Sequence, residues 1–312
     1  MISLIIQRIN KQVMIIVQLL GGMGNQMFQY ACGRHLAILN NTELKLDLSL
    51  LENRVFFDKN FFYRSYDLDL FNIKASIATQ SDIPLYRSTW RINSIPHRLF
   101  NLFQIKMEGF KYVFIRRLNS YNLLRYNDKV LKKRGKIYVA GYPFSARYFD
   151  SIRDIILEEL SFVKDLPPAC AELEEKIKTT NSVSINIRRK DFLVQKSIGT
   201  HGIEYINKAV AQIALRVSDP VFFVFSDDME WCRENVKIDF PHHFVNEELS
   251  GKRNEDHLQL MTLCKHFIIS NSTYGWWGAW LSNYHGKIVV APNRLFQKLN
   301  DVDMIPQEWL RV

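Results

Sequence analysis

Short, mostly apolar runs alternate with polar turns along the C-terminal half of the chain. Four runs are predicted to be strands, at 183–187, 221–225, 267–270 and 288–291. Runs of this kind are typical of parallel strands that are buried on both faces of a sheet. Because the carboxyl ends of such strands meet at one edge, the turns after them can gather around a ligand. The pattern predicts a parallel α/β unit with a binding site at that edge.

The N-terminal part begins with a similar pattern. The mostly apolar run 13–20 leads into the glycine-rich turn 21–26 and then into helix-like residues. Glycines let backbone amides approach a ligand closely, and the start of a helix adds partial positive charge. The turn lacks the Lys-Ser/Thr of a P-loop and the third glycine of a dinucleotide fingerprint. Alone, it indicates a strand, a turn and a helix but no particular ligand.

Two arginines stand at the end of the run 183–187. Arg188 and Arg189 follow it at once, and Asp191 comes two residues later. The planar fork of an arginine matches a phosphate in two-point contact, which favours an anionic ligand. The alternative is that both arginines pair with surface carboxylates.

A third segment repeats the order of strand, polar turn and helix. A capped amphipathic helix is predicted over 254–266, followed by the run 267–270 and the polar turn 271–273. Hydroxyls and amides at this turn could hold phosphate oxygens. Trp276 and Trp277 are expected to pack the last helix against the sheet.

Three motifs in this chain together resemble a known family. They are Gly-Gly-x-Gly-Asn-Gln-x-Phe-Gln-Tyr-Ala at 21–31, Asn-x-Arg-Arg-x-Asp at 186–191 and Asn-Ser-Thr-Tyr-Gly-Trp-Trp at 271–277. The chain resembles the inverting α-1,2-fucosyltransferases, from about residue 14 to residue 309. This resemblance implies an α/β glycosyltransferase of the B type, with two Rossmann-like domains facing a cleft.

The chain departs from the family pattern at three positions. Asn186 stands where the family has histidine, and Tyr274 and Gly275 replace the more usual Phe-Ser. An asparagine amide can donate a hydrogen bond but cannot titrate near neutrality, so any role of the imidazole must be altered.

The length and two prolines predict the domain boundary. At 312 residues the chain exceeds the usual size of one simple domain. Pro167 and Pro168 cannot continue the preceding helix and stiffen the connection. We predict a boundary after residue 163, and the resemblance implies an acceptor-side domain at 1–163 and a GDP-fucose-binding domain at 164–312.

The resemblance implies a specific reaction. L-fucose would move from GDP-β-L-fucose, with inversion, to the 2-hydroxyl of a terminal galactose on a cell-surface polysaccharide or lipid-linked oligosaccharide. One rival hypothesis is another nucleotide-sugar transferase or another fucosyl linkage, because a fold does not fix the substrate. The other is a non-catalytic protein that binds glycans or polyanions.

The resemblance also implies catalytic roles. Arg188 would grip the β-phosphate of the donor and take the electrostatic role of a metal, so neither a metal nor a cofactor is expected. Arg189 would contact the donor or form a structural salt bridge. Asp191 would be the catalytic base or would orient an arginine.

Other donor and acceptor contacts are predicted in the same way. Asp256 would bind the guanine edge, with stabilisation of a helix start as the alternative. Ser272 and Thr273 would hold phosphate oxygens, with helix capping as the alternative. Further candidates are Asn25, Gly22 and Gly24 on the donor side, and His201 and Glu204, more weakly, on the acceptor side.

Asp67 and Asp69 have the spacing of the Asp-x-Asp motif that holds a metal in many glycosyltransferases. The segment around them alternates polar and apolar residues, so an ordinary strand is predicted instead.

Composition bounds the remaining expectations. The four cysteines are scattered, which argues against a disulfide framework or a zinc site. No apolar run is long enough to span a bilayer, so a cytoplasmic protein of bacterial type is expected.

The net charge of +9 is concentrated in one segment. Residues 85–136 hold thirteen Lys and Arg against two acids. This basic segment could be a solvated face, or it could rest on anionic lipid headgroups as a peripheral membrane contact. Nucleic-acid binding is not expected, because no nucleic-acid module accompanies the charge.

Overall fold

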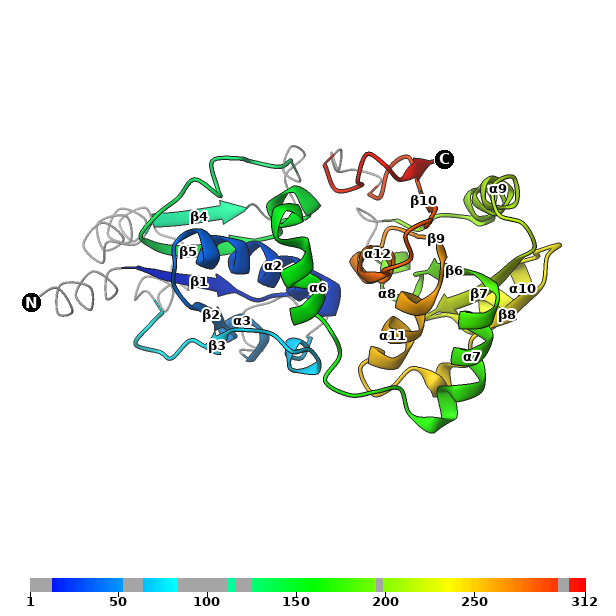
Figure 1. Ribbon diagram of the computed structural model, residues 1–312, viewed down its shortest axis with the longest axis horizontal. Helices are drawn as coiled ribbons and strands as arrows, with labels where there is room; N and C mark the ends of the chain where they lie inside the picture. The colour runs from blue at the N-terminus through cyan, green and yellow to red at the C-terminus, as the bar shows by residue number, and fades with distance from the viewer. Residues whose placement is uncertain (1–12, 53–63, 84–110, 116–124, 195–198, 297–302) are drawn as a thin grey trace, which may run out of the picture. The chain divides into compact units, whose positions relative to one another are not determined.

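The computed structural model describes residues 13–52, 64–83, 111–115, 125–194, 199–296 and 303–312. The chain divides into two compact units, Met1–Ser161 (unit 1) and Phe162–Val312 (unit 2). The division falls close to the boundary expected from the sequence after residue 163. Each unit is an α/β structure built on a parallel sheet (Figure 1). The predicted α/β class is therefore confirmed.

Unit 1 contains a five-stranded sheet in the order β3-β2-β1-β5-β4, in which the described pairs are parallel. Its strands are β1 Met14–Gln18, β2 Leu44–Asp47, β3 Ser76–Ile77, β4 Lys111–Ile115 and β5 Lys136–Gly141. Its helices are α2 Met23–Leu39, α3 Ser49–Glu52 and α6 Arg153–Glu159, with short 3₁₀ turns η1 Leu68–Leu70, η2 Ala146–Tyr148 and η3 Asp150–Ile152.

The segment around Asp67 and Asp69 is not a strand. Residues Leu68–Leu70 form the 3₁₀ turn η1, so the predicted strand is wrong. The Asp67 N–H donates to Gln26 Oε1 at 2.9 Å, and its carboxylate accepts from Ser65. These contacts bend the chain under the start of α2, which an alternating pattern alone could not reveal.

Unit 2 contains a six-stranded sheet in the order β11-β10-β9-β6-β7-β8, and its described pairs are also parallel. Its strands are β6 Asn181–Ile187, β7 Pro220–Ser226, β8 His242–Phe244, β9 His266–Ile268, β10 Val289–Ala291 and β11 Leu310–Arg311. Its helices are α7 Ala171–Thr179, α8 Lys190–Val194, α9 Ile203–Ala214, α10 Met229–Asn235, α11 Glu255–Leu263 and α12 Thr273–Leu281, with 3₁₀ turns η4 Pro168–Cys170 and η5 Glu247–Leu249.

Both faces of the unit 2 sheet are covered. On one face, β6 and β7 share a buried core with residues of α9 and α10, including Ile185, Ile206 and Cys232. Elsewhere in the unit, α7 packs against β6, and α11 packs against both α7 and α12, where Trp276 and Trp277 are fully buried. Side chains alternate along a strand, so Ser184 and Asn186 face away from the α9 core. The central strand therefore directs Asn186 toward α12, the helix that follows β9.

Candidate functional site

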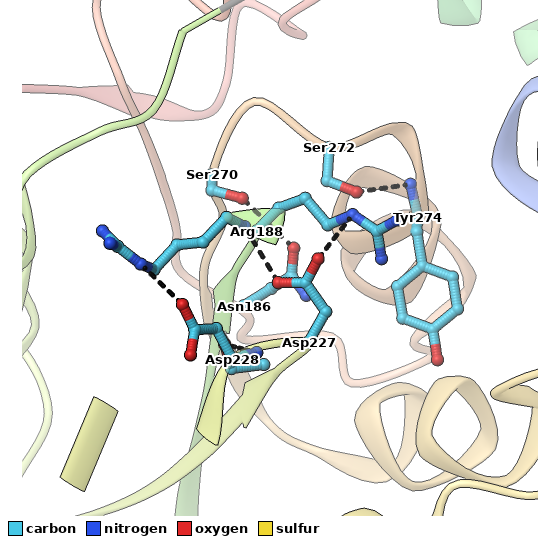
Figure 2. A network of polar contacts seen from close by, with 9 residues as sticks. Asn186, Arg188, Asp227, Asp228, Ser270, Ser272 and Tyr274 are labelled. Atoms are coloured by element: carbon cyan, nitrogen blue, oxygen red, sulfur yellow. Dashed lines mark hydrogen bonds and ion pairs between the residues drawn. The ribbon is translucent and has the colours of Figure 1, made fainter. Parts of the chain in front are cut away.

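Three neighbouring strands of unit 2 end in polar residues at one edge of the sheet. Arg188 follows β6, Asp227 follows β7, and the segment Ser270–Ser272 follows β9 (Figure 2). Since β9, β6 and β7 are adjacent and parallel, their carboxyl ends lie side by side. The structure thus forms the polar edge that the sequence predicts.

Asp227 holds the backbone and side chain of the arginine motif. Its Oδ2 lies 3.2 Å from Arg188 Nε, and its Oδ1 accepts the Arg189 N–H at 2.9 Å. The Arg188 side chain runs from the end of β6 toward Ser272 and Tyr274 (Figure 2). Its Cζ is also 5.9 Å from the centre of the Phe192 ring. Arg188 is therefore held in place beside the start of α12, with 28% of its side chain exposed.

Arg189 lies in a different environment. Its Nε is 3.1 Å from Asp228 Oδ2, and its Cζ stacks 3.6 Å from the centre of the Trp231 ring. The Asp228 N–H in turn donates to Ser226 Oγ at 3.0 Å. These are the contacts that the salt-bridge alternative expects. Donor contact by Arg189 stays a prediction.

Ser272 forms the N-cap of α12. Its Oγ accepts the Tyr274 N–H at 3.2 Å, which satisfies one of the unpaired amides at the start of the helix. Thr273 is the first residue of the helix and is half-buried. The structure thus shows the capping alternative for Ser272, and phosphate binding by both residues stays a prediction.

Asn186 and Gly275 occupy two of the positions that depart from the family motifs, and they touch each other. A Cβ added to Gly275 would lie 2.3 Å from Asn186 Oδ1, closer than atoms can approach. The same Oδ1 accepts from Ser270 Oγ at 3.3 Å, and Asn186 is 7% exposed. The asparagine therefore fills the space that a side chain at residue 275 would need. The two sequence changes are coupled in space.

Asp256 lies in the first turn of α11 and ends the turn 250–256. Its N–H donates to Ser250 O at 3.1 Å, and the half-buried carboxyl sits against Gly251, whose φ of +75° favours glycine. Desolvation and then the neighbouring Glu255 raise the pKa of Asp256. Its binding to a guanine edge stays a prediction.

The start of α11 differs from the expected capped helix. Asn254 occupies the N-cap position in the left-handed conformation, with φ of 65°, and its side chain makes no capping hydrogen bond. Its carbonyl instead accepts from the Tyr274 hydroxyl at 2.5 Å and from the Leu258 N–H at 3.2 Å. The helix also ends at Leu263, because His266 already belongs to β9.

The two weaker candidates for acceptor binding, His201 and Glu204, lie in different environments. His201 lines a small cavity at the end of β6 together with Asn186, Arg188 and Ser270. Glu204 points to solvent on α9 and pairs with Lys208 at 2.7 Å, which lowers the pKa of its carboxyl. The structure brings His201 to the arginine motif and places Glu204 on the helix surface.

Asp191 lies in α8, but its side chain is outside the described residues. Gly22, Gly24 and Asn25 belong to unit 1, where Gly22 is the N-cap of α2 and Asn25 is half-buried. Their assigned roles stay predictions. Most of the basic segment 85–136 is also outside the described residues, so the suggested membrane contact stays a prediction too.

Sequence reasoning assigned no specific role to Asp227 or Tyr274. The turn Ser226 to Asp228 was expected to hold ligand, whereas its two acids anchor the two arginines. The sequence shows an acidic turn and a basic turn, but not that the strands before them are neighbours in the sheet. Nothing in the sequence indicates that Tyr274 reaches Asn254, twenty residues away.

Among the residues that the structure describes, no group of three or more His, Cys, Asp or Glu could hold a metal ion. The cysteines Cys32, Cys170, Cys232 and Cys264 are buried and unpaired by disulfides. No helix in the described ranges is long and apolar enough to cross a membrane.

Two units, each built on a parallel sheet, form the two-domain α/β architecture of B-type glycosyltransferases. The fold is similar to a solved structure of an Arabidopsis thaliana FUT1 variant in complex with GDP, with a TM-score of 0.52, 12% identity, and coverage of 96% of this chain and 78% of that one.

Comparison of sequences identifies the family. The family model described as Glycosyl transferase family 11 matches residues 102–311, and the chain belongs to this family. It is 30% identical to an alpha-1,2-colitosyltransferase of Escherichia coli, over 96% of this chain and 98% of that protein. It is 32% identical to the O-antigen biosynthesis glycosyltransferase WbnK of Escherichia coli, over 94% and 98%. The galactoside alpha-(1,2)-fucosyltransferase 2 of Mus musculus is 26% identical, over 64% and 62%.

Proposed function

We propose that this glycosyltransferase moves L-fucose from GDP-β-L-fucose, with inversion, to the 2-hydroxyl of a terminal galactose on a cell-surface or lipid-linked glycan. The observation that carries the proposal is the placement of Arg188. It stands at the end of the central strand, is held by Asp227 and lies beside the start of α12. Membership of the family and the similarity to a galactoside fucosyltransferase support the choice of substrates.

Arg188 supplies positive charge where the leaving group becomes negative. As the bond between sugar and phosphate breaks, charge grows on the GDP oxygens, and a cation that is already in place stabilises it. The ion pair with Asp227 fixes the guanidinium before the donor binds. In this proposal the arginine takes the role that a metal has in other glycosyltransferases.

The other donor contacts are proposed around the same edge. Ser272 and Thr273 lie at the start of α12, where amides and the helix dipole favour phosphate oxygens. Asp256 would accept hydrogen bonds from the ring N–H and amino group of guanine. Asn25, Gly22 and Gly24, at the start of α2 in unit 1, stay predicted donor contacts.

Asp191 is the proposed base that removes the proton from the acceptor hydroxyl. The alternative, that it orients an arginine, remains open. The nearby Asn186 cannot take this proton, because an amide does not titrate near neutrality. An oxocarbenium-like transition state makes even a weak nucleophile adequate, so deprotonation can come late.

A second candidate differs in the sugar. Colitose is L-fucose without its 3-hydroxyl, and the similarity to an alpha-1,2-colitosyltransferase extends over 98% of that protein. Discrimination between the two sugars depends on whether the site hydrogen-bonds the 3-hydroxyl, since an unpaired polar group in the site penalises the deoxy sugar strongly.

To test the proposal, GDP release is measured after purified protein is mixed with lactose as acceptor and either GDP-fucose or GDP-colitose as donor. EDTA is present throughout, and Arg188→Ala and Arg216→Ala are assayed alongside. Arg216 is the matched control because it bonds Gln212 on the surface of α9.

We expect turnover in EDTA that falls by on the order of 10²-fold or more in Arg188→Ala and is retained in Arg216→Ala. Faster GDP release from GDP-colitose than from GDP-fucose would identify colitose as the transferred sugar. Loss of turnover in EDTA that added Mg²⁺ restores would contradict the role given to Arg188. Failure to bind either GDP-sugar or GDP would overturn the function itself.

A further inference from the structure

The side chain of Tyr274 joins the start of α12 to the turn 250–256. The turn leads into α11 and carries Glu255 and Asp256. Its geometry is tight, since Gly251 and Asn254 both have positive φ values, of 75° and 65°. Glycine and asparagine are among the residues that adopt this left-handed conformation most readily, so the sequence suits a tight turn here.

The contacts that hold the turn are specific. The Arg253 N–H donates to Glu255 Oε2 at 2.6 Å, and the Asp256 N–H donates to Ser250 O at 3.1 Å. Both bonds lie inside the turn, so neither ties it to the rest of the unit. The Tyr274 hydroxyl reaches in from α12 and donates to Asn254 O at 2.5 Å.

Tyr274 is well suited to this contact. It is the second residue of α12, so its backbone is fixed next to the Ser272 cap. Desolvation raises the pKa of its hydroxyl, which therefore stays protonated and remains a donor at working pH. The family motif more usually has phenylalanine at this position, so the hydroxyl of Tyr274 is a departure from that motif.

We propose that Tyr274 is a positioning residue for base recognition, holding the carboxylates of the turn 250–256 at a fixed distance from the start of α12. A nucleoside diphosphate presents its base edge and its phosphates at a separation limited by the ribose. If the carboxylates of the turn 250–256 stay at a fixed distance from the start of α12, they can favour a base whose edge offers two N–H groups while the phosphates stay at α12. The inference rests on the proposed function, in which Asp256 binds guanine.

The test compares the binding of GDP and IDP by calorimetry. IDP lacks the exocyclic amino group of guanine, so it forms one hydrogen bond fewer with a carboxylate. We expect the unmodified protein to favour GDP on the order of tenfold, the value for one hydrogen bond to a charged group. Tyr274→Phe should reduce that preference to roughly threefold or less, because the carboxylate is no longer held, while pyrophosphate binds as before.

Tyr205→Phe is the matched control. Tyr205 is a tyrosine of the same unit whose hydroxyl also donates to a main-chain carbonyl, that of Ile269, at 2.5 Å. Removing it deletes the same kind of bond without touching the turn 250–256. We expect its preference for GDP over IDP to stay that of the unmodified protein, even if it unfolds at a lower temperature.

Asp256→Asn separates the inference from the function on which it rests. If Asp256→Asn abolishes the GDP preference and Tyr274→Phe retains it, Tyr274 is only structural and the inference is wrong. If the unmodified protein binds GDP and IDP equally, or if Asp256→Asn leaves the preference for GDP unchanged, Asp256 does not bind guanine. The inference about Tyr274 is then wrong too. If neither nucleotide binds, the proposed function fails.

Discussion

The glycine motif of unit 1 turns its polar side chains inward, whereas the arginine motif of unit 2 presents them at the edge of the sheet. In unit 1, the Gln29 side chain bonds both the N–H and the carbonyl of Leu20 and also donates to Gly141 O. Tyr30 is fully buried and donates to Glu159. In unit 2, Arg188 lies at the surface of the sheet edge, oriented by Asp227.

This difference shows that a specific motif need not be a binding motif throughout. The glutamines of the glycine motif satisfy buried backbone groups that would otherwise destabilise the fold. Gln26, for example, donates to the carbonyls of Gly21 and Ser65 and accepts the N–H of Asp67. The identity of these residues is therefore explained by structure alone.

The largest expected effect separates the two adjacent arginines. Arg188→Ala should lower kcat by on the order of 10²–10³-fold, the effect of removing one preorganised charge from a site. Arg189→Ala should lower kcat much less, because its contacts with Asp228 and Trp231 are internal. Steady-state GDP release measures both. Equal losses in the two variants would show that Arg189 also contacts the donor.

Tyr30→Phe tests the structural side of the comparison. The Tyr30 hydroxyl donates to Glu159 and accepts the Lys74 N–H at 2.9 Å, so its removal leaves two groups without this partner. We expect a loss of about 1–3 kcal/mol in the free energy of unfolding, the net value of two lost hydrogen bonds, since Glu159 keeps its ion pair with Arg34. Urea unfolding measures this loss. Unchanged stability would contradict the structural role of the motif.

Gly275→Ala tests the contact between the two motif departures in unit 2. An added methyl would collide with Asn186, so we expect a loss of about 1–3 kcal/mol, typical of overpacking. Asn186→Ala should relieve part of it in the double variant, with a coupling energy of at least about 0.5 kcal/mol. Gly202→Ala is the control, because nothing lies within 4 Å of its Cβ position. If the losses in the free energy of unfolding are additive in the double variant, the proposed coupling of Asn186 and Gly275 is wrong.

Asp256→Asn has the smallest expected effect on stability. The pKa of the carboxyl is raised in the folded state above its ordinary 3.8, so folding favours its protonated form. The ionised carboxylate therefore opposes folding at neutral pH, and this penalty disappears as the pH falls below 3.8. We expect the variant to melt at a higher temperature than the unmodified protein at pH 7 and to lose this advantage as the pH falls below 3.8. A lower melting temperature at pH 7 would contradict the sign.

The comparison also shows what the sequence could predict. The strand at 183–187, the glycine turn and the helix that begins at Thr273 follow from periodicity and turn residues, because these features are local. The ends of elements were less certain, as the helix predicted over 254–266 shows by stopping at Leu263. The strand expected around Asp67 was wrong, because a contact with Gln26 bends the chain there.

The partners within the site could not be read from the sequence. The pairing of Asp227 with Arg188, and that of Asp228 with Arg189, depends on the order of strands β6 and β7 in the sheet. The contact between Asn186 and Gly275 depends on how α12 packs on β6. These are long-range arrangements, and residue spacing along the chain carries little information about them.

The most direct test measures turnover per folded molecule in Arg188→Ala and Tyr30→Phe, side by side in one GDP-release assay, with the folded fraction taken from unfolding curves. We predict that Arg188→Ala loses at least about 100-fold while remaining as folded as the unmodified protein. Tyr30→Phe should be less stable but should turn over at the original rate per folded molecule. Retained turnover in Arg188→Ala would contradict the central claim that the edge of the unit 2 sheet performs the chemistry.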